Sequence, residues 1–310
     1  MTDDHRDGLV IRVTGYEVWV ESGAGVVACL LRGRFRKKDP KFQIVAGDRV
    51  TFAPPGPVAE HGAIESVYPR ATFLSRFVGG RASGERVIIA NLDMLIVVVT
   101  PSEPGLSLPF LDRILVSAER GNNDIVIVAN KTDLAGDDGG LDEFFELYEG
   151  IGYRMFRASA KTGDGIDEVD ALLAGGIYAF VGQSGVGKSS ILNRIDPSLD
   201  LKTSYVANKT GRGRHTTTFS QLFPMKGGYV ADTPGMQTFG FPGTDRIEIA
   251  DCFPEFRPLS ESCRFQPCTH SHEPGCEIKH KLEEGTIAQS RYRSYISMLD
   301  EVSKREQERY

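Results

Sequence analysis

The chain has 310 residues and lacks any long apolar run. The longest such run, 94–100, ends at Pro101, whereas a helix that crosses a bilayer needs roughly 20 apolar residues. The first eight residues, MTDDHRDG, are polar and acidic. A secretory signal would instead begin basic and then turn apolar. We therefore expect no membrane span, no secretion, and a location in the cytoplasm.

Cysteine is also scarce, with five residues in all. An odd number does not make a complete disulfide framework, and three of the five lie close to a histidine, which favours a metal site in a reducing compartment. The composition, 40% hydrophobic and 25% charged, is that of an ordinary folded protein. The length predicts two or three domains.

An overall excess of positive charge is missing, because the net charge is -6, and this argues against nucleic-acid binding by the whole surface. The charge is nevertheless uneven: residues 1–90 carry 13 basic and 10 acidic side chains, and residues 91–245 carry 13 and 20. The basic residues of the first part cluster around Phe35 and Phe42, and they are Arg32, Arg34, Arg36, Lys37, Lys38 and Lys41. This pattern is typical of a loop that contacts phosphates and stacks on bases. A solvated hairpin tip is the alternative.

Short apolar segments separated by glycine and proline predict five strands near the amino terminus, at 10–13, 16–20, 26–31, 49–52 and 63–67. Five strands in about sixty residues favour an all-β OB-fold barrel, which commonly binds oligonucleotides. An SH3-like barrel would give a similar pattern. The arginine- and glycine-rich segment from Tyr68 to Arg86 is interpreted as a mobile basic linker.

After Asn91 apolar runs alternate with helical stretches. The predicted strands are 92–100, 125–129, 153–157, 177–181, 219–223 and 228–231, and the predicted helices are 108–120, 141–150, 166–173 and 188–196. This alternation predicts an α/β domain with a mostly parallel sheet covered by helices. The last segment, 246–310, ends in a predicted helical tail. Its apolar positions recur at helix spacing, and they are Ile287, Tyr292, Tyr295, Ile296, Leu299 and Val302.

A phosphate-binding loop of the form GxxxxGK[ST] follows the predicted strand 177–181 and precedes a helix. Its glycines turn backbone amides towards phosphates, Lys188 reaches the outer phosphates, and the Ser189 hydroxyl can bind magnesium. The segment predicts a nucleoside triphosphate site formed by Gly182, Gln183, Ser184, Gly185, Val186, Gly187, Lys188, Ser189 and Ser190.

A second motif, Asn130-Lys131-Thr132-Asp133, follows the predicted strand 125–129 and is expected to bind the base of the nucleotide. The Asp133 carboxylate can accept two hydrogen bonds from guanine donors that adenine lacks, and an adenine would leave this carboxylate unpaired. Asn130 is expected to hold the loop, and the stem of Lys131 to lie over the ring. Ser159, Ala160 and Lys161 supply the backbone amide expected beside the guanine oxygen.

Asp232-Thr233-Pro234-Gly235 gives a DxxG element, in which Asp232 holds magnesium through water and the Gly235 amide senses the terminal phosphate. Between this element and the phosphate loop lies a glycine-rich, threonine-rich switch, where Thr217 is the expected magnesium ligand. The order of the motifs is unusual, because the base-reading segments precede the phosphate loop. A circular permutation explains this order without changing the site. The segment after DxxG then leads straight into the carboxy-terminal module.

That module contains Cys263, Cys268, His270 and Cys276. Three thiolates and one imidazole form the closed ligand set of a structural zinc site, with no position for a reactive water. His272 is the rival for the imidazole position. Cys29 and Cys252 are interpreted as buried thiols without a role.

The combination of Ala46-Gly47-Asp48-Arg49-Val50 with NKTD, SAKT, GQSGVGKS, GRHTTT, DTPG and the cysteine cluster resembles the circularly permuted RsgA (YjeQ, YloQ) GTPase family over nearly the whole chain. The resemblance implies an OB-fold at 1–70, a GTPase domain at 71–245 with a basic linker at 71–90, and a zinc-binding domain at 246–310. It favours His270 as the fourth zinc ligand. It further implies a monomer that uses GTP, GDP, Mg²⁺ and one Zn²⁺ and acts on the small ribosomal subunit and its rRNA late in maturation.

Catalysis is the least constrained feature of the sequence. Ras-like enzymes position the attacking water with a glutamine directly after DxxG, but this chain has Met236, so intrinsic turnover should be slow. The resemblance offers His215 as the substitute, acting with Lys188 and Thr217. His215 contacting RNA is the alternative, and Arg212 and Arg214 fit either charge stabilisation or RNA contact. A GTP-regulated RNA-binding scaffold and a metabolic P-loop ATPase or kinase are the competing functions.

Overall fold

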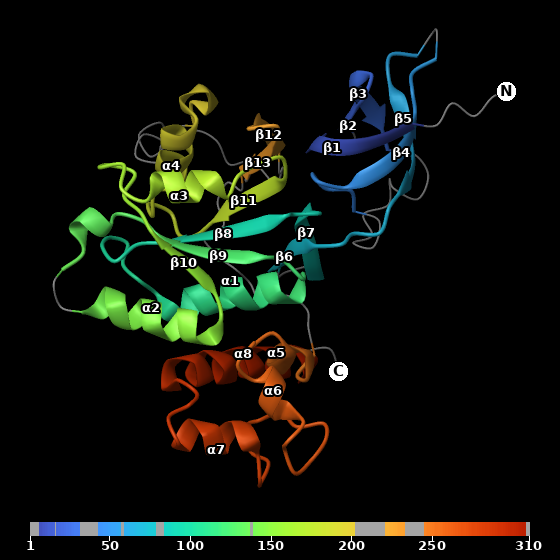
Figure 1. Cartoon of the computed structure of the whole chain (residues 1–310). Coiled ribbons are helices and arrows are strands. Elements are labelled where there is room, and N and C mark those ends of the chain that lie inside the picture. Colours follow the sequence, from blue (N-terminus) through green and yellow to red (C-terminus); the bar gives the residue numbers. More distant parts are fainter. Residues whose placement is uncertain are drawn as a thin grey trace, which may run out of the picture.

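The computed structural model describes residues 6–15, 17–31, 43–56, 59–78, 84–136, 139–201, 221–232 and 245–307. A barrel, a sheet flanked by helices, and a helical module follow one another along the chain (Figure 1). Within the described ranges no helix is both long enough and apolar enough to cross a membrane.

The barrel is built from β1 (Arg6–Thr14), β2 (Glu17–Ser22), β3 (Gly25–Leu30), β4 (Arg49–Ala53) and β5 (Gly62–Val67). The strand order β1-β2-β3-β5-β4 closes because β4 also pairs with β1, and only β3 and β5 are parallel. Fully buried Val10, Val18, Val50 and Phe52 fill its interior. This confirms the predicted five-stranded OB-fold barrel. The basic cluster of 32–42 lies outside the described residues.

The interpretation of 68–86 as a mobile linker is wrong for its two strands. β6 (Phe73–Val78) and β7 (Gly84–Ala90) form an antiparallel hairpin. Leu74 and Ile89 are fully buried, and the Ser117 hydroxyl of the first long helix donates to the carbonyl of Ser75 at 2.7 Å. The arginines and glycines suggested a linker, but a single apolar face is enough to fix a short hairpin on a helix.

The central sheet has the order β10-β9-β8-β11-β13-β12, and all of these strands are parallel except β12. Its strands are β8 (Met94–Val99), β9 (Ile125–Ala129), β10 (Arg154–Arg157), β11 (Ile177–Val181), β12 (Gln221–Met225) and β13 (Gly228–Asp232). Its helices are α1 (Leu108–Arg120), α2 (Gly140–Ile151), α3 (Ile166–Ala171) and α4 (Lys188–Ile195). Two one-turn helices, η3 (Thr132–Leu134) and η4 (Pro197–Leu199), complete it.

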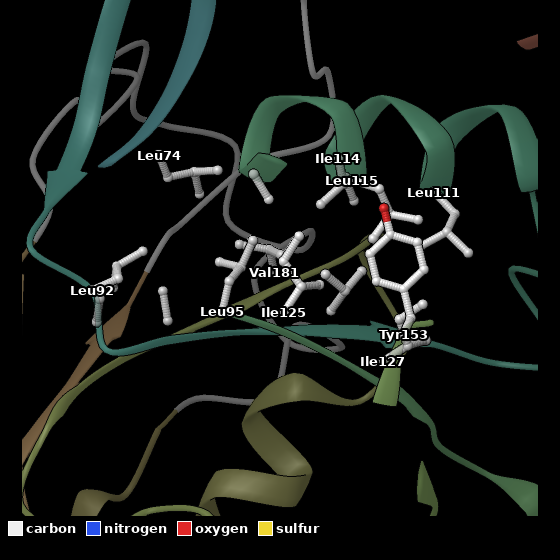
Figure 2. Packing of buried hydrophobic residues seen from close by; sticks show 14 of the residues in the cluster. Leu74, Leu92, Leu95, Leu111, Ile114, Leu115, Ile125, Ile127, Tyr153 and Val181 are labelled. Atoms are coloured by element: carbon white, nitrogen blue, oxygen red, sulfur yellow. The ribbon is translucent and has the colours of Figure 1, made fainter. Parts of the chain in front are cut away.

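Helices cover both faces of this sheet, α1 and α2 on one side and α3 and α4 on the other (Figure 1). Successive side chains of β8 point to opposite faces, as a strand requires. Leu95 and Val97 enter the core beneath α1 and α2, while Ile96 and Val98 enter the core beneath α3 and α4. Figure 2 shows Leu95 close to Ile114 and Leu115 of α1. Because both faces of the sheet are buried, the sequences of its central strands are continuous apolar runs.

The carboxy-terminal module comprises α5 (Glu248–Asp251), α6 (Arg257–Ser260), α7 (Glu277–Glu283) and α8 (Gln289–Gln307), and α8 lies along α1. A buried ion network joins the two helices: the Arg291 guanidinium donates to Asp112 Oδ1 at 2.6 Å and to Glu255 Oε1 at 2.7 Å. Tyr148 of α2 donates to the same Asp112 oxygen at 2.7 Å. Although burial alone would lower it, the pKa of Arg291 lies well above its usual range because Asp112 and Glu255 face it.

A separate junction joins the barrel to the hairpin and sheet. Fully buried Asp48 accepts two hydrogen bonds from Arg70, at 2.7 and 2.9 Å. The Ala90 amide donates to the carbonyl of Ala46 at 3.0 Å. Gly47 has φ +89°, and a Cβ there would lie 1.9 Å from the Ala90 carbonyl oxygen, so only glycine fits this close approach. The segment 46–50 therefore holds the barrel against the sheet domain.

Candidate nucleotide site and metal centre

The predicted phosphate loop lies where the sequence placed it, between β11 and α4. Gly182, Gly185 and Gly187 all have positive φ, and a Cβ on Gly182 would lie 2.2 Å from the Val98 carbonyl oxygen. The Lys188 ammonium donates to the carbonyls of Gly182 and Gln183 at 2.8 and 2.9 Å, so it lies across the loop. Such a loop at a helix amino terminus presents amides to an anion.

Asn130 connects the base-reading segment to the phosphate loop. Its side-chain amide donates to the Val186 carbonyl at 2.8 Å, and its side-chain oxygen accepts from the Ala160 amide at 3.0 Å. Asn130 is 1% exposed, and its Nδ2 would lie 2.2 Å from a Cβ on Gly187. Three segments that are far apart in sequence therefore meet at one side chain, as the permuted order of motifs predicted.

Asp133 lies beside Ser159 and Lys161. The Ser159 hydroxyl donates to Asp133 Oδ1 at 2.7 Å, and the Lys161 ammonium lies 3.6 Å from Oδ2. The Ser159 hydrogen bond first, and the charge of Lys161 as well, hold the pKa of Asp133 below its ordinary value despite partial burial. The carboxylate is thus kept ionised and fixed, which suits it to accept hydrogen bonds from a base.

The loop around Asp133 is itself held by backbone contacts. Lys131 has φ +60°, and its ammonium donates to the Glu103 carbonyl at 2.8 Å. The Thr132 amide and hydroxyl both donate to the Ala158 carbonyl, at 3.2 and 3.0 Å. These contacts hold the loop that carries Asp133 in place.

Several predicted site residues lie outside the described part of the chain: Arg212, Arg214, His215, Thr217, Gly235 and Met236. Asp232 ends β13, where its backbone pairs with Gln221. β13 is hydrogen-bonded to β11, so this strand end lies next to the strand that leads into the phosphate loop.

Cys263, Cys268, His270 and Cys276 come together in the carboxy-terminal module, with their ligand atoms within 4.8 Å of one another. His270 Nδ1 lies 3.5 Å from the sulfurs of Cys263 and of Cys276, and these two sulfurs are 4.0 Å apart. A tetrahedral zinc ion, with Zn–S near 2.3 Å and Zn–N near 2.0 Å, separates its ligand atoms by roughly 3.5 to 3.8 Å. The donor set therefore fits zinc. His272, the rival, is exposed and outside the cluster.

Neighbouring residues that are not part of the ligand set orient His270 and Cys263. The other nitrogen of His270, Nε2, lies 3.3 Å from the Ser260 hydroxyl, and the Glu277 amide donates to the Cys263 sulfur at 3.3 Å. Burial raises the pKa of Cys268 to about 12 and lowers that of His270. A bound dication would offset this cost of burial, because it stabilises the thiolate form of Cys268.

Sequence reasoning missed several supporting residues of both sites. The Ser159 hydroxyl holds Asp133 directly, where only a backbone amide was expected from this segment. Tyr292 and Tyr295 were interpreted as apolar helix positions, yet their hydroxyls donate to the carbonyls of His270 and Thr269 at 2.9 and 2.6 Å. The hydroxyl group of each tyrosine was the feature of the sequence that could have indicated these hydrogen bonds, because a buried tyrosine hydroxyl usually has a partner. Cys29 and Cys252 are buried, with the pKa values of their thiols raised to about 11 and about 12.

The chain matches the sequence model of the RsgA GTPase family over residues 67–242. It is 43% identical over 302 residues to the small ribosomal subunit biogenesis GTPase RsgA of Moorella thermoacetica, covering 97% of this chain and 98% of that protein. The protein of the same name in Gemmatimonas aurantiaca is 38% identical, with coverages of 96% and 98%.

Solved structures agree with this result. YjeQ from Thermotoga maritima superposes with a TM-score of 0.75 at 36% identity, covering 96% of this chain and 98% of its own. YloQ, described as a circularly permuted GTPase, superposes with a TM-score of 0.72 at 30% identity, with coverages of 97% and 96%. Sequence and fold together show that this chain is a GTPase and belongs to the RsgA GTPase family.

Proposed function

We propose that this GTPase binds guanine nucleotides between the phosphate loop and the loop of Asp133, and hydrolyses GTP to GDP and phosphate in the service of small-subunit maturation. The observation that carries the proposal is Asn130, which hydrogen-bonds Val186 of the phosphate loop and Ala160 of the base-side loop. A nucleotide that lies along this bridge has its phosphates at the amino terminus of α4 and its base at Asp133.

In this proposal each motif has its own role. The phosphate loop, Gly182 to Ser190, cradles the phosphates, and Asn130, Lys131, Asp133 and the Ser159–Lys161 segment hold the base. Ser189 and Thr217 would bind magnesium, with Asp232 acting through water, and the ion would neutralise charge on the phosphates. Lys188 stabilises the outer phosphates, the Gly235 amide senses the last one, and His215 orients the attacking water by a hydrogen bond.

We further propose that the partner is the small ribosomal subunit. The relatives from Moorella and Gemmatimonas carry that subunit in their names, and the present chain matches both over almost their whole length. A five-stranded barrel of the OB type and the basic cluster of 32–42 suit contact with rRNA. We propose a cytoplasmic monomer with domains at 1–70, 71–245 and 246–310, which leaves the subunit on hydrolysis, and a structural zinc in the last domain.

The decisive experiment measures GTP hydrolysis with and without purified small subunits. We expect slow turnover alone, since Met236 replaces the water-positioning glutamine, and a large stimulation by the subunit. His215→Ala should lose the stimulated rate while keeping GDP affinity. Turnover that small subunits leave unchanged would refute the proposed partner.

Two further variants separate this proposal from its competitors. Lys188→Ala should abolish turnover and leave RNA binding intact, whereas a GTP-regulated scaffold would have little turnover to lose and would show the change in its RNA binding. Excess ATP should fail to displace labelled GDP, because the Asp133 carboxylate has no donor to pair with on adenine. Displacement by ATP at equal concentration would instead favour a metabolic ATPase.

A further inference from the structure

The sheet ends at β10, and this edge is open. No described strand pairs with β10 on the side away from β9. The Ala158 amide donates to Ala129 of β9, so by the alternation of a strand Met155 and Arg157 direct their backbone groups to the outside. A Cβ added at Gly165 would lie 1.8 Å from the Arg157 carbonyl oxygen, so the backbone of Gly165 covers this carbonyl. The Met155 amide and carbonyl and the Arg157 amide remain without a hydrogen-bond partner among the described residues.

An open cavity of about 610 Å³ lies along this edge. The helix α2 lies on one face of β10 and α3 on the other (Figure 1), and side chains of α2 and of the start of α3 line the cavity. Its apolar floor comes from Phe145, Met155 and Phe156, which are buried or half-buried. An unpaired edge beside an apolar floor is the geometry that accepts an added strand.

The rim of this cavity is acidic. Asp142, Glu146 and Glu149 of α2 and Glu168 of α3 line it, against a single cation, Arg157. Arg157 is an example of a cation that binds to this rim. Its guanidinium lies 4.1 Å from the centre of the Phe145 ring and donates to Asp142 at 2.6 Å. Within the described chain no cation pairs with Glu146, Glu149 or Glu168.

We propose that β10 is a docking edge for an extended, arginine- or lysine-rich segment of a partner protein, which adds to the sheet as a further strand. The strand's backbone would pair with Met155 and Arg157, and its cations would face the four carboxylates. RNA is disfavoured here, because its phosphates would meet the same carboxylates.

The first test uses the full chain loaded with GDP and a synthetic hexapeptide of alternating arginine and valine. We expect the backbone amide resonances of Met155 and Arg157 to shift and their hydrogen exchange to slow at least tenfold, because they gain hydrogen bonds. A peptide of the same sequence with alternate backbone nitrogens methylated keeps the charge but cannot extend the sheet. Equal binding of both peptides would overturn the proposal.

Charge is tested separately. Glu146→Lys combined with Glu149→Lys should weaken the unmodified peptide roughly tenfold, while Glu283→Lys combined with Glu284→Lys, the same charge change at two exposed positions at the end of α7, should leave it unchanged. Unaltered GDP affinity would show that the variants are folded. Two results would contradict the proposal. One is that single-stranded oligouridine binds at the same amides in place of the peptide. The other is that the resonances of these amides shift with protein concentration in the absence of any ligand, which indicates that a second copy of this chain binds there.

Discussion

At the scale of single residues, the carboxylate of Asp133 is the group expected to select guanine. Asp133→Asn exchanges an acceptor for a donor, so GDP affinity should fall roughly a hundredfold through the loss of charge-assisted hydrogen bonds, while xanthosine diphosphate should bind better than GDP. Titration with both nucleotides measures this. Asp167→Asn on exposed α3 is the matched control. If the variant keeps its preference for guanine, Asp133 does not face the base.

Arg291 shows what one buried charge contributes to stability. It is 0% exposed and contacts Asp112 and Glu255, so Arg291→Ala would leave the buried Asp112 and the half-buried Glu255 without a cation. We expect the free energy of unfolding to fall by about 3 to 5 kcal/mol, measured by urea denaturation. Arg291→Lys should be intermediate, because a lysine ammonium keeps the charge but lacks the planar fork of donors with which the guanidinium contacts Asp112 and Glu255. A loss below about 1 kcal/mol for the alanine variant would mean that the network is not stabilising.

At the scale of elements, the zinc cluster connects α6, α7 and the loop between them. Removing the metal with a chelator should unfold this loop and α7, because α7 contributes a single buried side chain, Ile278, to the apolar cluster of the module. Loss of far-ultraviolet circular dichroism and of bound zinc measures it. Cys268→Ser should lose the zinc, and His272→Ala should keep one per chain. A chelated protein with unchanged dichroism would show that the metal is not structural.

Elements with a strong local pattern could be predicted from the sequence. The strand 125–129 and the helix 108–120 have the predicted boundaries, because a doubly buried strand and an amphipathic helix each leave a clear periodicity. The hairpin 73–90 was missed, since its fold depends on packing against α1. The Arg291–Asp112 pair joins residues 179 positions apart, and no local pattern marks such a contact.

At the scale of the whole molecule, the order of the motifs places the expected second switch, after DxxG, directly before the module that contains the cysteine cluster. β13 ends at Asp232, and α5 begins at Glu248 and packs on α8. However, α8 is fixed to α1 by Arg291, so a swing of the module alone would separate a buried ion pair. We therefore expect movement of the switch to shift α1 and the module together.

The junction between the barrel and the sheet domain includes the ion pair of Asp48 with Arg70. Asp48→Asn leaves the partly buried Arg70 without a carboxylate and should lower the free energy of unfolding by about 1.5 to 3 kcal/mol. Because these residues contact only the barrel and its junction, intrinsic GTP turnover should persist while stimulation by small subunits falls. Asp7→Asn, which removes the charge of an exposed carboxylate that accepts from the Tyr68 hydroxyl, is the control. If Asp48→Asn reduces intrinsic and stimulated turnover by the same factor, the barrel acts on the nucleotide site itself and not on docking.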